Sequence, residues 1–186
     1  GFDHMVEYFQ LESLVVPGAT VLEIGVGLGV SIKGFCERGC VVSALDICEE
    51  AFAVVEGRAA VNYLHERVEE LPENHFDLAV SHLVTQHMSE DDILWQFPAV
   101  IRSLKGTGCF RVQFAGSDIP EENNIAETIV GTPADGKVSM LGGRMVRTPE
   151  YAIQLVERCG GRAVRVSGVR RFPHFKSYWY WLEVAR

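Results

Sequence analysis

A short apolar run that breaks into three closely spaced glycines constrains the fold more than any other part of this sequence. Residues 20–39 read TVLEIGVGLGVSIKGFCERG. The continuously apolar start is typical of a strand buried on both faces of a parallel sheet. Apolar residues then recur at helical spacing as far as Gly39, a residue type that commonly ends helices. The stretch therefore predicts a strand, a glycine turn and a helix, in that order.

Strands and helices continue to alternate along the chain. Apolar runs predict strands at residues 40–46, 61–65, 75–82 and 108–116. Helices are predicted at 49–60, 89–104 and 149–161, the second of them interrupted or rearranged at Pro98. Two last strands, at 162–169 and 177–184, are separated by a link too short for a parallel crossover, so they should pair antiparallel. This order predicts a single doubly wound α/β domain with an antiparallel hairpin at its end.

A long connection interrupts the alternation. Residues 116–148 are rich in Gly, Pro, Asn and Asp. A connection of this length inside a compact domain is more often a functional lid than an idle loop. We therefore expect 116–148 to be a lid insertion over a substrate.

Composition limits the class of protein and its partners. No apolar run approaches the roughly 18 residues of a membrane span, and the first residues lack the order of a signal peptide. We expect a soluble, cytoplasmic monomer or homodimer without a membrane partner. The net charge of −8 argues against a protein that binds nucleic acid chiefly through its phosphates. Five cysteines without a CxxC pair predict buried free thiols and no metal site; they are Cys36, Cys40, Cys48, Cys109 and Cys159.

The spacing of the glycines narrows the choice of ligand. A dinucleotide-binding turn has the pattern GxGxxG, which would place its third glycine at position 30, but that residue is Val30 and the glycine is Gly29. Glu23 stands two residues before the first glycine, where a carboxylate would face the phosphates of a dinucleotide with nothing to offset its burial. A cationic ligand suits Glu23 better.

Four stretches, in this order, resemble one known family. They are VLEIGVGLG, VVSALDIC, VEELPENHFDLAVSHLVTQHM and IRSLKGTGCFRVQF. Together they are similar to the class I S-adenosylmethionine-dependent methyltransferases, especially the broad group that acts on small molecules. The resemblance covers residues 14–115 and, in outline, the final hairpin. It implies a Rossmann-like sheet of seven strands, mostly parallel, with an antiparallel last strand.

The resemblance also implies which residues hold the cofactor, S-adenosylmethionine. The glycine turn would line the methionine and ribose part of the cofactor through Glu23, Gly25, Val26 and Gly27. Gly29 would open the helix. Asp46, at the end of the second strand, would accept hydrogen bonds from both ribose hydroxyls, an arrangement that a carboxylate suits. Its alternative role is that of an acid at a helix N-terminus. Ile47 would pack on the adenine.

The segment expected at the adenine edge departs from the family pattern. Similar proteins carry D-A-E-x-L-P, whose Asp meets the adenine amino group, but here Arg67 takes the place of that acid. Either the backbone around Val68, with Glu69 nearby, does this work, or the cofactor binds more weakly than usual. Ser81, at the end of the fourth strand, completes the predicted cofactor site.

Two groups of residues are candidates for the acceptor side. His82 ends the fourth strand and His87 follows it, at the sheet edge where open α/β sheets bind ligands, and either could act as a general base. Their spacing is wrong for a metal pair on one helical face, and Ser89 with Asp92 predicts a helix capping box, not a metal site. Arg170, Arg171 and His174 lie in the turn between the last strands, where they could bind an anionic acceptor or be a solvated surface.

The sequence thus predicts a methyltransferase that acts on a small, perhaps anionic acceptor, more readily at oxygen than at nitrogen or carbon. Two alternatives stay open. One is an NAD-dependent oxidoreductase, which shares the glycine turn and the acid after the second strand. The other is a non-catalytic protein that binds S-adenosylmethionine.

Overall fold

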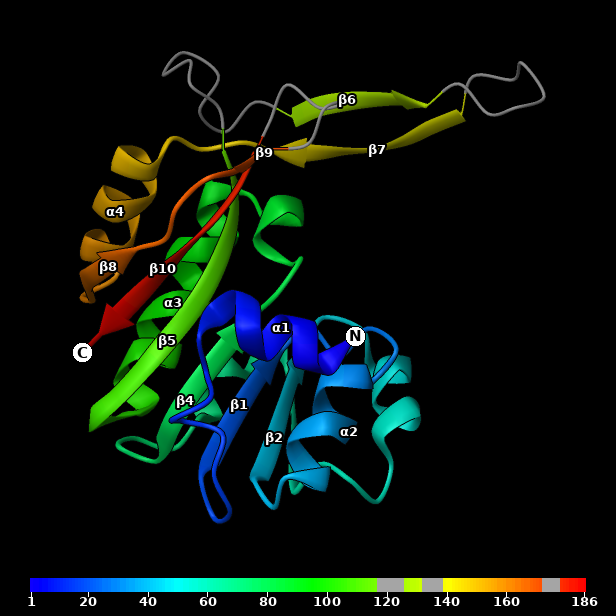
Figure 1. Ribbon diagram of the computed structural model, residues 1–186, viewed down its shortest axis with the longest axis vertical. Coiled ribbons are helices and arrows are strands. Elements are labelled where there is room, and N and C mark those ends of the chain that lie inside the picture. Colours follow the sequence, from blue (N-terminus) through cyan, green and yellow to red (C-terminus); the bar gives the residue numbers. More distant parts are fainter. Residues whose placement is uncertain (117–125, 132–138, 172–177) are drawn as a thin grey trace.

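A computed structural model describes the backbone of residues 1–116, 126–131, 139–171 and 178–186, and the side chains of 1–116, 145–171 and 178–186 (Figure 1). The prediction for His174 and the prediction for residues 117–125 and 132–138 of the long connection fall outside these residues. No helix of the described part is long and apolar enough to cross a membrane.

A mixed sheet forms the centre of the molecule. The strands run in the order β3-β2-β1-β4-β5-β10-β8, and the two-residue β9 pairs with β10. Neighbouring strands from β3 to β5 are parallel, while β10 is antiparallel to both β5 and β8. Their bounds are β1 Thr20–Ile24, β2 Val41–Asp46, β3 Val61–Leu64, β4 Phe76–Ser81, β5 Leu104–Gly116, β8 Arg162–Val166, β9 Arg170–Arg171 and β10 Tyr178–Ala185. The predicted mostly parallel sheet with an antiparallel last strand is confirmed.

Helices cover both faces of this sheet, as in a doubly wound fold (Figure 1). The described helices are α1 Phe2–Phe9, α2 Val30–Glu37, α3 Glu90–Ser103 and α4 Pro149–Arg158, with 3₁₀ turns η1 Glu49–Val55, η2 His65–Glu70 and η3 Thr85–His87. The alternation of β1 shows the two layers. Val21 packs in the cluster formed with α1 and α2, while Leu22 and Ile24 pack in the cluster formed with α3 and α4.

Two helix predictions were wrong. Residues 49–55 form a 3₁₀ turn, and no α-helix extends to residue 60. Helix α3 continues through Pro98 without a break. A capping box between Ser89 and Asp92 fixes its start, as predicted, and its buried face includes Ile93 and Phe97. Tertiary packing therefore outweighs the hydrogen bond that proline removes.

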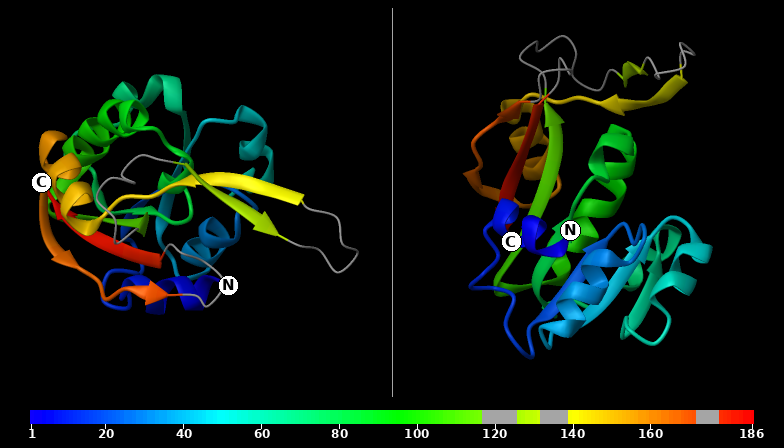
Figure 2. Two further views of the ribbon diagram at one scale, coloured as in Figure 1. Left: turned by 90° about the horizontal axis from the view of Figure 1, so that it is seen from above. Right: turned by 45° about the vertical axis from the view of Figure 1, so that its right-hand side comes forward.

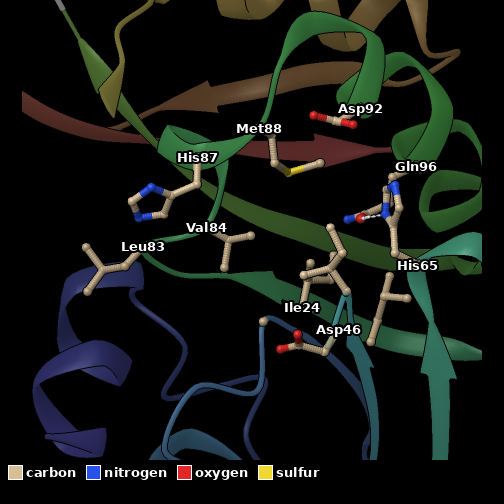
Figure 3. Close-up of a pocket in the computed structure, with 12 residues that line it drawn as sticks. Ile24, Asp46, His65, Leu83, Val84, His87, Met88, Asp92 and Gln96 are labelled. Atoms are coloured by element: carbon tan, nitrogen blue, oxygen red, sulfur yellow. Dashed lines mark hydrogen bonds between the residues drawn. The ribbon is translucent and has the colours of Figure 1, made fainter. Parts of the chain in front are cut away.

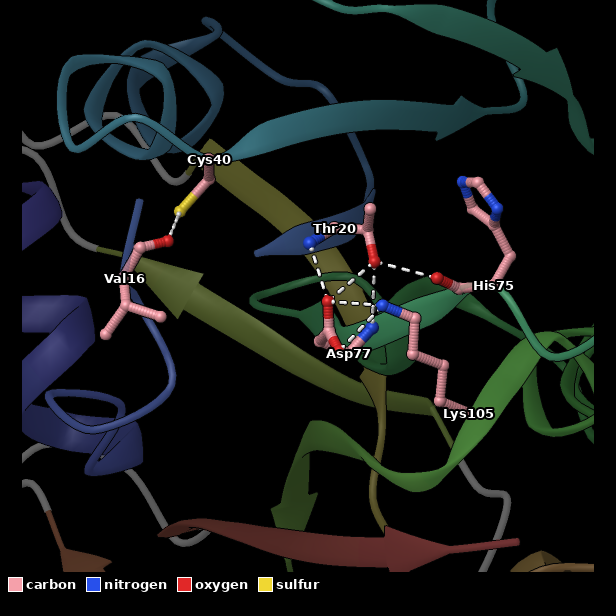
Figure 4. A network of polar contacts seen from close by, with 6 residues as sticks. All are labelled: Val16, Thr20, Cys40, His75, Asp77 and Lys105. Atoms are coloured by element: carbon pink, nitrogen blue, oxygen red, sulfur yellow. Dashed lines mark hydrogen bonds and ion pairs between the residues drawn. The ribbon is translucent and has the colours of Figure 1, made fainter. Parts of the chain in front are cut away.

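Asp77 ties three strands together at the amino edge of the sheet (Figure 4). Its carboxylate accepts hydrogen bonds from the N–H of Thr20 at 2.9 Å and the Thr20 hydroxyl at 2.8 Å, and it pairs with Lys105 Nζ at 2.9 Å. Burial raises the pKa of Asp77, but Lys105 and Thr20 outweigh burial, so this pKa is lowered overall. This network lies at the end of the sheet opposite to the cavity described below.

The predicted lid region contains two strands that the sequence did not suggest. Strands β6 Ala126–Gly131 and β7 Ser139–Met145 pair antiparallel in a separate two-stranded sheet. They lie beyond the carboxyl end of β5 and extend to one side of the body (Figures 1 and 2). β7 lies beside η3. At the end of this region Val146 bridges to Ala115, which returns the chain to the main sheet.

Candidate functional site

A cavity of about 270 Å³ opens at the carboxyl ends of β1, β2 and β4, where the strand order reverses (Figure 3). Open α/β sheets bind their ligands at this position, because the loops that follow neighbouring strands diverge there. Most of the lining is apolar, with polar groups at its margins. The lining residues are Ile24, Gly25, Leu45, Asp46, Ile47, His65, Leu83, Val84, His87, Met88, Asp92 and Gln96.

Gly25 of the glycine turn lines the cavity, and the glycines of this turn have different reasons to be glycine. Gly25 has φ 84°, and a Cβ there would lie 2.3 Å from Val84 Cγ2. Gly29 has φ 70° and is the N-cap residue of α2, which confirms that it opens the helix. Gly27 also has positive φ, but no atom lies within 4 Å of the position its Cβ would occupy. The backbone at Gly27 therefore faces open space that a ligand could approach closely.

Asp46 stands between the glycine turn and the segment after β2. Its Oδ2 accepts a hydrogen bond from the N–H of Val26 at 2.6 Å, and its Oδ1 accepts one from the N–H of Cys48 at 2.9 Å. Each carboxylate oxygen can accept a further bond. The next residue, Ile47, is 77% exposed although its side chain is apolar. Both predicted ribose and adenine contacts thus line the cavity, and Asp46 also holds the glycine turn.

Glu23 is buried one residue before Ile24, at 3% exposure. No described residue gives its Oε2 a hydrogen bond. Burial raises the pKa of Glu23 to about 8, and the nearby Ser31 only partly opposes this. At neutral pH and without a cation beside it, the carboxyl is therefore largely protonated.

Of the predicted cofactor residues, only Gly25, Asp46 and Ile47 line the cavity, while Glu23, Val26, Gly27, Val68, Glu69 and Ser81 do not. Val68 is buried in the hydrophobic core, and Glu69 is exposed on η2, where its carbonyl accepts a hydrogen bond from Arg102. Ser81 is fully buried at the end of β4, and Val26 is buried in the cluster below the turn. Arg67 pairs with Glu70 on the exposed side of η2. The segment expected at the adenine edge is thus not part of the cavity lining.

His65 and Gln96 occupy that end of the cavity instead, and the sequence reasoning missed both (Figure 3). His65 directly follows β3, so its place at the carboxyl edge was available as a signal. Gln96 follows Asp92 by one helical turn on α3, which places both on one face of that helix. Nothing in the sequence alone marks that face as lining a cavity.

The two candidate histidines have different surroundings. His87 lines the cavity, and its Nε2 lies 2.9 Å from Gln86 Nε2. His82 does not line it, but packs edge-on against Phe9 with ring centroids 5.6 Å apart. Burial, together with the positive charges of His4 and the N-terminus, lowers the pKa of His82 to about 4. A group with so low a pKa is a weak base, so His87 is the better candidate.

A buried arginine that the sequence reasoning did not consider holds the segment between β4 and α3. The side chain of Arg147 has no exposed surface, and its Nη1 and Nη2 donate to the carbonyls of Thr85 at 3.1 Å and Met88 at 2.7 Å. Tyr180 in turn donates its hydroxyl to the Arg147 carbonyl at 3.0 Å. Arg147 closes the predicted lid region, so it joins that region to the cavity wall.

The predicted acceptor residues Arg170 and Arg171 form β9, at the end of β10 where β5 terminates. Tyr178 is paired with both Gly116 and Arg171, which fixes this position. Arg170 Nη1 lies 3.0 Å from His4 Nε2, and the Arg171 guanidinium stacks 4.8 Å from the centre of the Tyr178 ring. Both arginines are exposed and neither lines the cavity.

Among the described residues, no group of three or more His, Cys, Asp or Glu side chains is placed to hold a metal ion. All five cysteines are free thiols. Cys40, Cys109 and Cys159 are buried as predicted, but Cys36 is only half-buried and Cys48 is exposed.

The comparison by sequence agrees with this geometry. Residues 21–108, from β1 into β5, match the model of a family described as a methyltransferase domain. The match covers slightly less than half of the chain, and it shows what this part of the chain is similar to. The predicted resemblance to methyltransferases is confirmed by this match, and the predicted enzyme class agrees with it. No curated protein matches the sequence.

Solved structures share the fold at low sequence identity. The 1,6-didemethyltoxoflavin-N1-methyltransferase of Burkholderia thailandensis, solved with that compound and S-adenosylhomocysteine, is 20% identical, with a TM-score of 0.70 over 98% of this chain and 78% of its own. An S-adenosylmethionine-dependent methyltransferase of Mesorhizobium loti is 18% identical, with a TM-score of 0.66 over the whole of both chains. The glycopeptide N-methyltransferase MtfA, solved with S-adenosylmethionine, is 17% identical, with a TM-score of 0.68 over 96% of this chain and 92% of its own.

Proposed function

We propose that this methyltransferase transfers the methyl group of S-adenosylmethionine to a small, anionic acceptor at oxygen. The observation that carries the proposal is the position of Asp46. Its carboxylate lines a mostly apolar cavity and accepts a hydrogen bond from the N–H of Val26, the residue before Gly27, while the exposed side chain of Ile47 follows it in the lining. This arrangement fits a nucleoside whose ribose meets the acid and whose base packs on the apolar wall.

The cofactor site supports a cationic ligand. When bound, S-adenosylmethionine supplies the electrophile, a methyl group on a sulfonium. A positive charge near Glu23 would favour the ionised carboxylate and so offset the cost of its burial. The chain itself then has to hold both reactants in line and exclude water, because positioning alone can supply a large part of the rate enhancement.

The acceptor side of the proposal is the rim formed by α1 and β9. Arg170 meets His4 there, and Tyr8 receives a hydrogen bond from Gln113 Nε2 at 3.4 Å. Two exposed guanidinium groups favour an anionic acceptor. β7 lies beside η3, which carries His87, and this contact supports the hairpin of β6 and β7 as the lid over that acceptor.

Nitrogen is the alternative acceptor atom. Two structures of similar fold are N-methyltransferases. An oxygen acid needs no strong base at neutral pH, whereas a protonated amine must lose a proton before it attacks. This difference favours an acidic hydroxyl over an amine as acceptor.

Two measurements test the proposal. Isothermal titration should give micromolar binding of S-adenosylhomocysteine and no binding of NAD. Incubation with S-adenosylmethionine labelled in its methyl group should then transfer label to phenols, sugar phosphates or carboxylates of a broad panel. Binding of NAD alone would replace the proposal by an oxidoreductase. Tight cofactor binding with no transfer to oxygen or nitrogen acceptors would indicate a binding protein.

A further inference from the structure

The side chain of Gln96 has an unusual position for an amide. It is 4% exposed, yet it lines the cavity, and no described residue accepts a hydrogen bond from its Nε2. A buried amide N–H group without an acceptor is destabilising, because it loses its hydrogen bonds to water and gains none in return. Such a group in a cavity wall points to a ligand that accepts its hydrogen bond.

His65 fixes the orientation of this amide. His65 Nδ1 lies 2.8 Å from Gln96 Oε1, so the ring donates to the amide oxygen and leaves the amide N–H groups without a partner among the described residues. In Figure 3 the two side chains lie side by side at one end of the cavity, and His87 lies at the other end. Asp92 lines the same end, and its Oδ2 is already engaged by Ser89.

The chemistry of this end matches the edge of an adenine. A glutamine can donate from Nε2 to a ring nitrogen of adenine and accept from its 6-amino group at Oε1, which has a second lone pair. The exposed side chain of Ile47 also borders the cavity, where the face of the base can rest. Arg67, which replaces the acid expected at this edge, is turned away and paired with Glu70.

We propose that Gln96, oriented by His65, reads the adenine edge of the cofactor and selects a 6-amino over a 6-oxo base. This inference rests on the proposed function, since it names the residues that recognise the base in the same cavity. Gln96 is the specificity-determining residue and His65 is its positioning residue. Ionised Asp92 adds an acceptor for the amino group and would repel the oxygen of a 6-oxo base.

The test compares two ligands by isothermal titration, S-adenosylhomocysteine and S-inosylhomocysteine, which differ in the 6-amino or 6-oxo group and in N1, an acceptor in adenine and an N–H donor in hypoxanthine. We expect the wild-type protein to prefer the adenosyl ligand by roughly tenfold or more, because the wrong base leaves buried polar groups unpaired. Gln96→Leu should reduce this preference to less than about threefold, chiefly by weakening adenosyl binding. His65→Phe should reduce it in part.

Two controls separate the possible failures. Gln154→Leu makes the same change at an exposed position of α4 and should leave both affinities unchanged. Asp46→Asn should weaken both ligands equally and keep the ratio. If Gln96→Leu does not fold, as judged by circular dichroism, Gln96→Glu gives the same comparison, because it removes the amide donor and should also change the ratio.

Each outcome decides something. If Gln96→Leu keeps the full preference for S-adenosylhomocysteine over S-inosylhomocysteine, the inference is overturned but the proposed function stays in place. If the wild-type protein binds neither ligand, the proposed function is overturned, and this inference with it. A reduced ratio in Gln96→Leu and an unchanged ratio in Asp46→Asn support the assignment of base recognition to Gln96.

Discussion

The charge of Glu23 depends strongly on its surroundings. Its pKa of about 8 in the folded chain exceeds the ordinary value of 4.5, and burial is the main cause. Between these two values the folded protein keeps a proton that the unfolded chain releases. The free energy of unfolding should therefore fall as pH rises through this window, by up to about 1.4 kcal/mol per pH unit from this group alone.

Glu23→Gln should remove that dependence, because the amide does not titrate. We expect the variant to equal the wild type near pH 4.5 and to exceed its stability increasingly up to pH 8, as measured by urea unfolding. Glu12→Gln, at an exposed site, is the matched control. Parallel pH profiles for wild type and Glu23→Gln would mean that Glu23 is ionised in the folded chain.

Asp46→Ala should weaken binding of S-adenosylhomocysteine by about 1–3 kcal/mol, the range for hydrogen bonds to a charged group. The same change frees the N–H groups of Val26 and Cys48, so it should also lower the melting temperature. Asp91→Ala, an exposed acid on α3, should change neither affinity nor stability. Unchanged affinity in Asp46→Ala would place the ribose elsewhere.

At the scale of elements, the segment from β4 to α3 depends on a side chain from another part of the chain. Leu83 has φ 62°, a strained value for a residue with a side chain, and its N–H donates to Gln113 Oε1 at 2.9 Å. Arg147 then holds the carbonyls of Thr85 and Met88. Strain at a cavity wall persists only where neighbours over-determine it. The wall is therefore fixed from two elements, β5 and the residues after β7.

Arg147→Met should destabilise the protein by roughly 2–4 kcal/mol, because it leaves two buried carbonyls without donors. It should also weaken S-adenosylhomocysteine binding severalfold, since Met88 and His87 line the cavity. Urea unfolding and isothermal titration measure the two effects. Arg162→Met, at an exposed position of β8, should affect neither. Loss of stability with full affinity would restrict Arg147 to a structural role.

At the scale of the whole molecule, the order of helices and strands was predictable from the sequence. The spacing of apolar residues and the glycines and prolines that end elements are local properties of the chain. The strands, the glycine turn and the capping box at Ser89 follow from residues that are near neighbours in the sequence. The adenine end of the cavity was not predictable. It brings His65 and Gln96, 31 positions apart, from η2 and α3 into contact, and the packing of those elements decides which side chains meet. Val68 and Arg67 show the same limit, since their neighbours turn them away from the cavity.

The two ends of β10 lie beside different arginines, so one pair of arginines can be compared with the other to test the acceptor rim formed by α1 and β9. Arg170 and Arg171 lie beside the start of this strand, while Arg162 lies beside its end, at Ala185. Arg170→Ala with Arg171→Ala should raise KM for an anionic acceptor by about tenfold and leave the affinity for S-adenosylhomocysteine unchanged. Arg162→Ala with Arg186→Ala removes the same charge at the opposite edge and should not alter KM. Equal effects of the two pairs would indicate long-range charge, not a subsite.

The exposed thiol of Cys48 makes the protein a potential optical reporter. Its N–H bonds to Asp46, and its side chain is the exposed one among five free cysteines. A thiol-reactive fluorophore should therefore label Cys48 first, two residues from the carboxylate that is proposed to hold the ribose. We expect S-adenosylhomocysteine to slow the labelling, and the fluorescence of labelled protein to change on binding. Cys48→Ser should abolish the fast labelling phase. Ligand screening could then use this fluorescence change and would need no radioactive methyl group.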